Sequence, residues 1–158
     1  MLFRSSLSPK FKFIPGNGFW IEESKIYEKS KLVSMICSDK ANTPLQKFRV
    51  DFANNNKEKI DVYGHLCRGI QTKEEGIIDY MFSVCIENDD HDTYFTEKIL
   101  DAFATGTIPV YKGTRNVINH YNKDGILFLD DIEIDDLTPE LYYSKLDVIR
   151  EKIGRAHV

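Results

Sequence analysis

Phe82-Ser-Val-Cys-Ile-Glu-Asn88 is an apolar run that ends in two polar residues, as a buried strand of a parallel sheet does. A polar loop follows it, and then a helix pattern with one apolar face, which Thr96 can cap. Gly106 stands where a left-handed helix end belongs, and Thr107 to Val110 is the next apolar run. This succession predicts two parallel strands joined by a helix, with a loop at the carboxyl end of the first strand.

The same alternation of strand and helix extends on both sides of this segment. Upstream, the apolar run 31–38 precedes a helix that Thr43 caps, Pro44 opens and the asparagines 54–56 end. The sequence therefore predicts an α/β fold, a Rossmann-like doubly wound parallel sheet, in which ligands bind beyond the carboxyl ends of the strands. The remaining expected elements are strands at 60–64 and 126–129, a short helix at 75–81, and a last helix that begins at Thr138-Pro139.

Length and composition describe one ordinary globular domain of 158 residues, 42% of them hydrophobic and 29% charged. The net charge of −4 gives no broad positive field, so general binding to nucleic acid or to anionic membranes is not expected. Cys37, Cys67 and Cys85 match no zinc spacing, and we interpret them as reduced core thiols. No stretch approaches the roughly 18 apolar residues that a membrane helix needs. We therefore expect a soluble chain without a targeting segment.

Three regions follow expected strands and are candidates for a ligand site: 38–49, 64–69 and 87–98. The last of them joins a strand to a helix N-terminus, which carries about half a positive charge and free N–H groups. Such a terminus is a natural seat for an anion. We therefore expect any anion site at this loop.

Two basic residues carry this expectation. Lys98 lies in the first turn of its helix, where its charge is unfavourable unless an anion binds there. The alternative is a lysine that points into solvent or pairs with Glu97. The Arg49 guanidinium can donate two hydrogen bonds to a diphosphate near the strand ends; the alternative is an ordinary surface arginine. We expect both side chains near solvent in a cleft, where they add little to folding stability.

Other patterns favour no specific chemistry. Asp89 to Asp92 lacks the glycine and the distal glutamate of a calcium loop, and we expect a solvated loop there without a metal. Asp130 to Asp136 is also expected to be a solvated loop. The chain contains no Gly-x-Gly-x-x-Gly after a strand, no Gly-Lys-Ser/Thr phosphate loop and no Gly-x-Ser-x-Gly elbow.

The ordered segments Phe82–Asn88, Asp92–Lys98, Asp101-Ala102 and Gly106-Thr-Ile-Pro-Val110 together resemble the signature of the alpha-1,3-fucosyltransferase family. These enzymes are inverting glycosyltransferases with the GT-B fold. The resemblance extends over about Tyr27 to Arg150. Its flanks agree with the family's donor half: Lys31-Leu-Val-Ser, Arg49 and Asp61-Val-Tyr-Gly64.

The resemblance implies that residues 27–152 are the C-terminal donor-binding domain of an enzyme that moves fucose from GDP-fucose to a glycan hydroxyl with inversion. It implies that fixed cations stabilise the departing GDP, so that no metal or other cofactor is obligatory. The alternatives are a GT-B domain that uses another nucleotide sugar, and a non-catalytic nucleotide-binding domain of flavodoxin-like architecture. The resemblance also implies roles for single residues. Arg49 and Lys98 would neutralise the diphosphate, and Glu97 would contact ribose or sugar hydroxyls. Asn88 and Tyr94 would line the same cleft.

The two ends of the chain are interpreted separately. The resemblance implies that residues 1–26 are a remnant of the N-terminal acceptor domain and interdomain segment, and that the missing domain supplies the general base. No catalytic residue is therefore assigned here, and we expect the chain alone to be inactive. Ile153 to Val158 resembles a translated sequencing adapter, and we interpret 153–158 as a non-native tail. The implied location is cytoplasmic for a bacterial or viral source and the Golgi membrane for a eukaryotic one.

Overall fold

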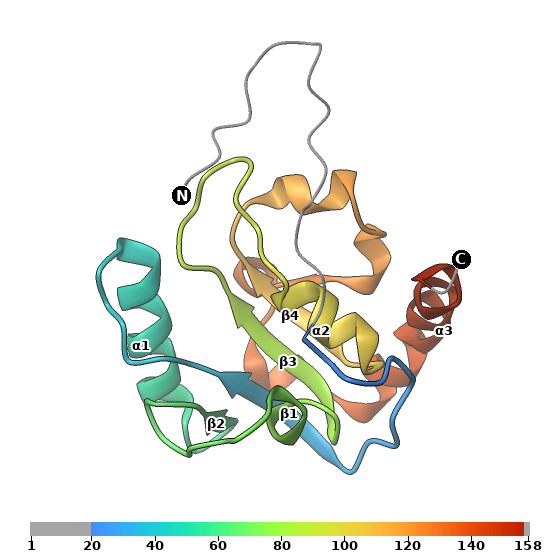
Figure 1. The fold of residues 1–158 in the computed structure, drawn as a ribbon, viewed down its shortest axis with the longest axis horizontal. Coiled ribbons are helices and arrows are strands. Elements are labelled where there is room, and N and C mark those ends of the chain that lie inside the picture. Colours follow the sequence, from blue (N-terminus) through green and yellow to red (C-terminus); the bar gives the residue numbers. More distant parts are fainter. Residues whose placement is uncertain (1–19, 157–158) are drawn as a thin grey trace.

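The structure is a computed structural model that describes residues 20–156 (Figure 1). Within this part, one five-stranded sheet has the order β2-β1-β3-β4-β5, and every neighbouring pair is parallel. The strand order reverses at β1 and β3, because β2 lies on one side of this pair and β4 and β5 lie on the other, as in a doubly wound sheet. The predicted α/β class is confirmed. The strands are β1 (Lys31–Ile36), β2 (Asp61–Tyr63), β3 (Tyr80–Ile86), β4 (Ile108–Lys112) and β5 (Leu127–Phe128).

The helices begin and end largely where local capping chemistry places them. As predicted, α1 (Pro44–Asn56) starts after Thr43, whose hydroxyl accepts a hydrogen bond from the Gln46 amide at 3.1 Å. Gly106 follows α2 (Lys98–Ala104) with φ +72°, and a Cβ there would lie 2.9 Å from the Ile26 Cα, so glycine is required. The last helix is α3 (Pro139–Ala156). Within the described residues, no helix is long and apolar enough to cross a membrane.

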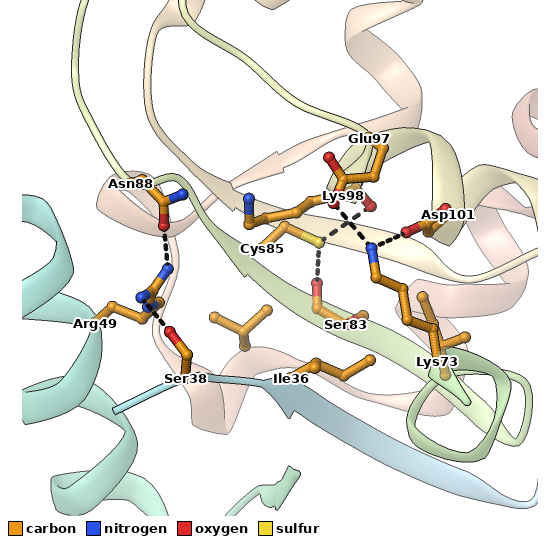
Figure 2. Close-up of a pocket in the computed structure, with 12 residues that line it drawn as sticks. Ile36, Ser38, Arg49, Lys73, Ser83, Cys85, Asn88, Glu97, Lys98 and Asp101 are labelled. Atoms are coloured by element: carbon orange, nitrogen blue, oxygen red, sulfur yellow. Dashed lines mark hydrogen bonds and ion pairs between the residues drawn. The ribbon is translucent and has the colours of Figure 1, made fainter. Parts of the chain in front are cut away.

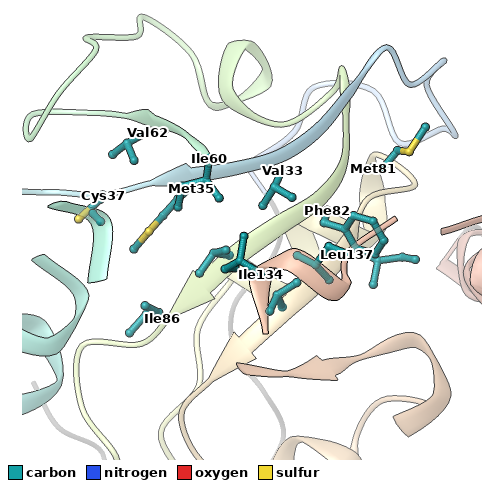
Figure 3. Packing of buried hydrophobic residues seen from close by; sticks show 14 of the residues in the cluster. Val33, Met35, Cys37, Ile60, Val62, Met81, Phe82, Ile86, Ile134 and Leu137 are labelled. Atoms are coloured by element: carbon teal, nitrogen blue, oxygen red, sulfur yellow. The ribbon is translucent and has the colours of Figure 1, made fainter. Parts of the chain in front are cut away.

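Helices cover both faces of the sheet. On one face, alternate strand residues such as Val33, Met35 and Phe82 share a buried cluster with Ala53 of α1 and Ile149 of α3 (Figure 3). The opposite face packs against α2 through a second buried cluster, to which β3, β4 and α2 contribute. All seven residues of β3 are buried, as the continuous apolar run predicted for a central parallel strand. This central strand carries the loop of the candidate site at its carboxyl end.

Two helix predictions are wrong, and long-range contacts explain both. The segment 75–81 is not a helix: a 3-10 turn, η1 (Lys73–Gly76), reaches only its first two residues, and β3 begins at Tyr80, whose side chain is wholly buried. Thr96 does not cap α2, because its hydroxyl donates to Glu87 at 2.7 Å; Glu97 is the N-cap residue. Tertiary contacts thus override the local patterns at both sites.

Three further expectations need correction. In the segment 153–158, which was interpreted as a non-native tail, the sequence was expected to break the helix pattern after Lys152, but α3 continues to Ala156; residues 157–158 lie outside the described part. Cys67 is exposed, whereas Cys37 and Cys85 are buried, so one of the three free thiols is not a core residue. The acidic segment 130–136 is not fully solvated, since it contains short 3-10 turns and buries Ile134 against the core. Most of the expected domain remnant, 1–19, lies outside the described residues.

Candidate functional site

A cavity of about 240 Å³ opens at the carboxyl edge of β1 and β3 (Figure 2). Its floor is formed by the ends of these two strands, and α1, α2 and η1 supply its polar walls. This is the edge at which a doubly wound sheet binds its ligands. The lining residues are Ile36, Ser38, Arg49, Lys73, Ile77, Ser83, Val84, Cys85, Asn88, Glu97, Lys98 and Asp101.

Arg49 contributes a buried positive charge to the wall of the cavity. Its Nη1 donates to Asn88 Oδ1 at 2.5 Å, and its Nη2 donates to Ser38 Oγ at 2.9 Å. The side chain is 4% exposed, so the expectation of a solvent-exposed arginine is wrong; α1 turns this residue inward, against the strand ends. Both partners are neutral, and within the described residues no carboxylate pairs with this guanidinium. A buried charge without a counter-ion is unfavourable, and an anionic ligand would remove that cost.

Lys98 is a second cation, and its partner differs from either alternative considered for it. The ammonium donates to Glu87 Oε2 at 2.9 Å and to Thr96 Oγ1 at 2.7 Å, rather than to Glu97. Glu87 is fully buried, and it also accepts from the Thr96 amide at 2.8 Å. Lys98 therefore lies over a buried carboxylate, with 22% of its side chain exposed toward the cavity. The expectation that Lys98 adds little to folding stability assumed a side chain near solvent, whereas here the ammonium pairs with a buried carboxylate, whose charge is costly if left unpaired.

A third cation, Lys73, reaches the cavity from η1. Its ammonium donates to Glu97 Oε1 at 2.9 Å and to Asp101 Oδ2 at 2.7 Å. The other carboxylate oxygen of Asp101 accepts from the Trp20 amide at 2.6 Å. Figure 2 shows this group on one side of the cavity and the Arg49 group on the other, with Lys98 between them. The sequence pattern gave no indication of Lys73.

The pKa values of this network follow from burial and ion pairing. Burial raises the pKa of Glu97, but the hydrogen bond from Lys73 and the charge of Lys98 more than offset it, so the pKa lies below its usual value. Burial lowers the pKa of Lys73, but its hydrogen bonds to Asp101 and Glu97 leave the pKa above its ordinary value. Burial is the largest effect at Asp101, whose pKa is raised despite its contact with Lys73. Glu97 and Lys73 are therefore both charged at neutral pH.

The structure brings four of the five predicted site residues together. Arg49, Asn88, Glu97 and Lys98 all line the cavity. Tyr94 does not line it; the Tyr94 hydroxyl lies 3.4 Å from the Asn88 amide nitrogen, which donates to it. Asn88 thus connects Tyr94 to the Arg49 guanidinium.

The other two predicted regions behave differently. The segment 38–49 contributes Ser38 and Arg49 to the cavity, whereas 64–69, which the structure describes fully, contributes nothing to it. The loop 89–92 is largely exposed, with His91 Nε2 3.4 Å from an Asp89 carboxylate oxygen. In the part of the chain that the structure describes, no group of three or more His, Cys, Asp or Glu side chains is arranged to hold a metal ion.

The arrangement can hold a polyanion beside a group that bears hydroxyls. Arg49 and Lys98 supply positive charge, while Glu97 can accept hydrogen bonds from hydroxyl groups. A doubly wound parallel sheet with such a cavity at its carboxyl edge defines the class of Rossmann-like nucleotide-binding domains.

Comparison with known proteins narrows this class. Residues 26–144 match the model of glycosyltransferase family 10 (fucosyltransferase), C-terminal part, and the chain belongs to this family. It is 30% identical over 109 residues to the alpha-(1,3)-fucosyltransferase FucT of Helicobacter pylori; the match covers 66% of this chain and 22% of that protein. The predicted resemblance to the fucosyltransferase family is therefore confirmed.

Solved structures agree with the family assignment. A crystal structure of alpha1,3-fucosyltransferase with GDP-fucose superposes with a TM-score of 0.57 at 25% identity, covering 79% of this chain and 38% of that one. The same kind of enzyme with GDP gives a TM-score of 0.58 at 24% identity, again over 79% of this chain and 38% of that one. This chain thus spans well under half the length of the relatives that it matches.

Proposed function

We propose that this chain is the donor-binding domain of a fucosyltransferase and that GDP-fucose is its ligand. The observation that carries the proposal is the buried Arg49 guanidinium, which has two neutral partners and faces a cavity beside a second cation. A nucleoside diphosphate supplies the missing negative charge, and a planar fork suits its oxygens. Membership of the fucosyltransferase family and the GDP-fucose bound in a structural neighbour support this choice of ligand.

The chemistry of the transfer agrees with these roles. Breaking the bond between sugar and phosphate places growing negative charge on the departing GDP, and fixed cations stabilise that charge. We assign this task to Arg49 and Lys98. When a phosphate oxygen enters, Lys98 shares its donors between that oxygen and Glu87. With these cations in place, a bridging metal ion is not needed for charge balance.

The general base is assigned to a part of the enzyme outside this chain. The two carboxylates that line the cavity, Glu97 and Asp101, already bind Lys73, and the buried Glu87, which does not line it, binds Lys98. A carboxylate oxygen that already accepts a hydrogen bond from an ammonium is poorly placed to take the proton of an acceptor hydroxyl. The acceptor in this proposal is a glycan hydroxyl.

Calorimetric titration of the 158-residue chain with GDP, UDP and guanosine tests the proposal. We expect GDP to bind more tightly than UDP, and guanosine to bind much more weakly than GDP. Lys59→Met is a matched control, because Lys59 pairs with Asp135 on the surface and does not line the cavity. Equal binding of GDP and UDP would favour another nucleotide sugar, and binding of neither would refute the proposed function.

A further inference from the structure

We propose that Lys73 is a positioning residue, which holds the Glu97 carboxylate in place to accept hydrogen bonds from the ribose hydroxyls of the bound nucleotide. The inference rests on the proposed function. Lys73 reaches the site from η1, whereas Glu97 precedes α2, so the contact joins two separate elements of the cavity wall. In this proposal Lys73 acts through Glu97 and does not contact the reacting atoms.

The geometry gives the two ends of this bridge different tasks. Asp101 is the fixed end: its side chain is 4% exposed, and it is bonded both to the Lys73 ammonium and to the Trp20 amide. Glu97 is the presented end, with 22% of its side chain exposed in the cavity wall. Lys73 donates to Oε1 of Glu97, which leaves Oε2 to accept from a ligand. The lysine thus anchors one oxygen and orients the other.

Electrostatics explain why a cation is needed at this point. Glu97 and Asp101 are one helical turn apart, and like charges at that spacing repel each other. The charge of Glu97 is one of the causes that raise the pKa of Asp101. Without the Lys73 ammonium, the more exposed carboxylate, Glu97, turns toward water and away from the cavity.

A titration with two nucleotides separates positioning from general electrostatics. GDP carries both ribose hydroxyls, and 2′,3′-dideoxy-GDP carries neither but has the same diphosphate. We expect Lys73→Met to weaken GDP binding about 10-fold, as for the loss of one charge-assisted hydrogen bond, and to leave dideoxy-GDP unaffected. Lys73→Arg should restore most of the affinity for GDP, because the cation is kept. Glu97→Gln should weaken GDP binding and leave dideoxy-GDP binding unaffected, as Lys73→Met does.

Controls keep the outcome decisive. If Lys73→Met does not fold, Asp101→Asn, which weakens the fixed end of the bridge, must produce the same selective loss. If Lys73→Met weakens GDP and dideoxy-GDP equally, or changes neither, Lys73 does not position a hydroxyl acceptor. A wild-type chain that binds no GDP overturns the proposed function itself, and the inference with it. Wild-type binding with an unselective Lys73 variant overturns the inference alone.

Discussion

Replacing Lys98 should produce two separable effects, one on stability and one on ligand binding. Lys98→Met removes the counter-ion of Glu87, whose side chain is fully buried. Removing one partner of a buried ion pair costs about 3–5 kcal/mol. Two hydrogen bonds from Thr96 still reach Glu87, so we expect the lower end, about 3 kcal/mol. For a domain of this size, that loss lowers the melting temperature by about 6–12 °C.

The double variant Glu87→Gln, Lys98→Met separates the two effects. It removes both charges, and the glutamine oxygen can still accept from the Thr96 amide, so most of the lost melting temperature should return. The ammonium is still absent, however. Affinity for GDP should therefore stay about 10- to 100-fold below wild type, while guanosine binds as before.

Thermal denaturation and calorimetry on the same three proteins check this reasoning. A Lys98→Met variant as stable as wild type would show that burial of Glu87 does not determine the cost. A double variant that binds GDP as tightly as wild type would show that Lys98 does not contact the diphosphate. A stability loss in the single variant alone is therefore no argument against a ligand role.

Three more outcomes are expected. Arg49→Lys should weaken GDP about 10-fold but not guanosine, since an ammonium cannot replace the planar fork, and calorimetry measures both. Burial lowers the pKa of Lys29 to about 7 from 10.5, so the folded state loses a proton that the unfolded state keeps. The free energy of unfolding should therefore rise with pH from about 7 to 10.5, by at most about 1.4 kcal/mol per pH unit, and urea titrations of Lys29→Met should lack this rise. Finally, the purified chain should form no fucosylated glycan product; detected product would place the general base within it.

The strands and helix starts were predictable wherever local chemistry decides them. The apolar run of β3 and the Thr43 capping box need no distant partner to be recognised. The Thr96 cap failed because a distant carboxylate, Glu87, takes its hydroxyl, and no local pattern records that contact. The failure at 75–81 has the same origin, since burial of Tyr80 in the sheet outweighs helix periodicity.

The candidate site shows the same division. Arg49 and Lys98 were found because they follow strands whose carboxyl ends meet at one edge of the sheet. Their partners were not: Glu87 stands at the end of a strand pattern, where a polar residue is ordinary. Lys73 lies 24 residues before Glu97, in a turn with no periodic pattern, and only the folded chain brings the two together.

The hydrogen bond from the Trp20 amide to Asp101 connects the backbone to the candidate site mechanically. A backbone amide moves with its chain, so a displacement of the peptide at Trp20 acts first on Asp101. Asp101 accepts a hydrogen bond from the Lys73 ammonium at 2.7 Å, and the same ammonium donates to Glu97 at 2.9 Å. The Trp20 ring also lies 5.8 Å from the Lys73 ammonium. The backbone position at Trp20 and the orientation of the Glu97 carboxylate are thus connected through three hydrogen bonds in series.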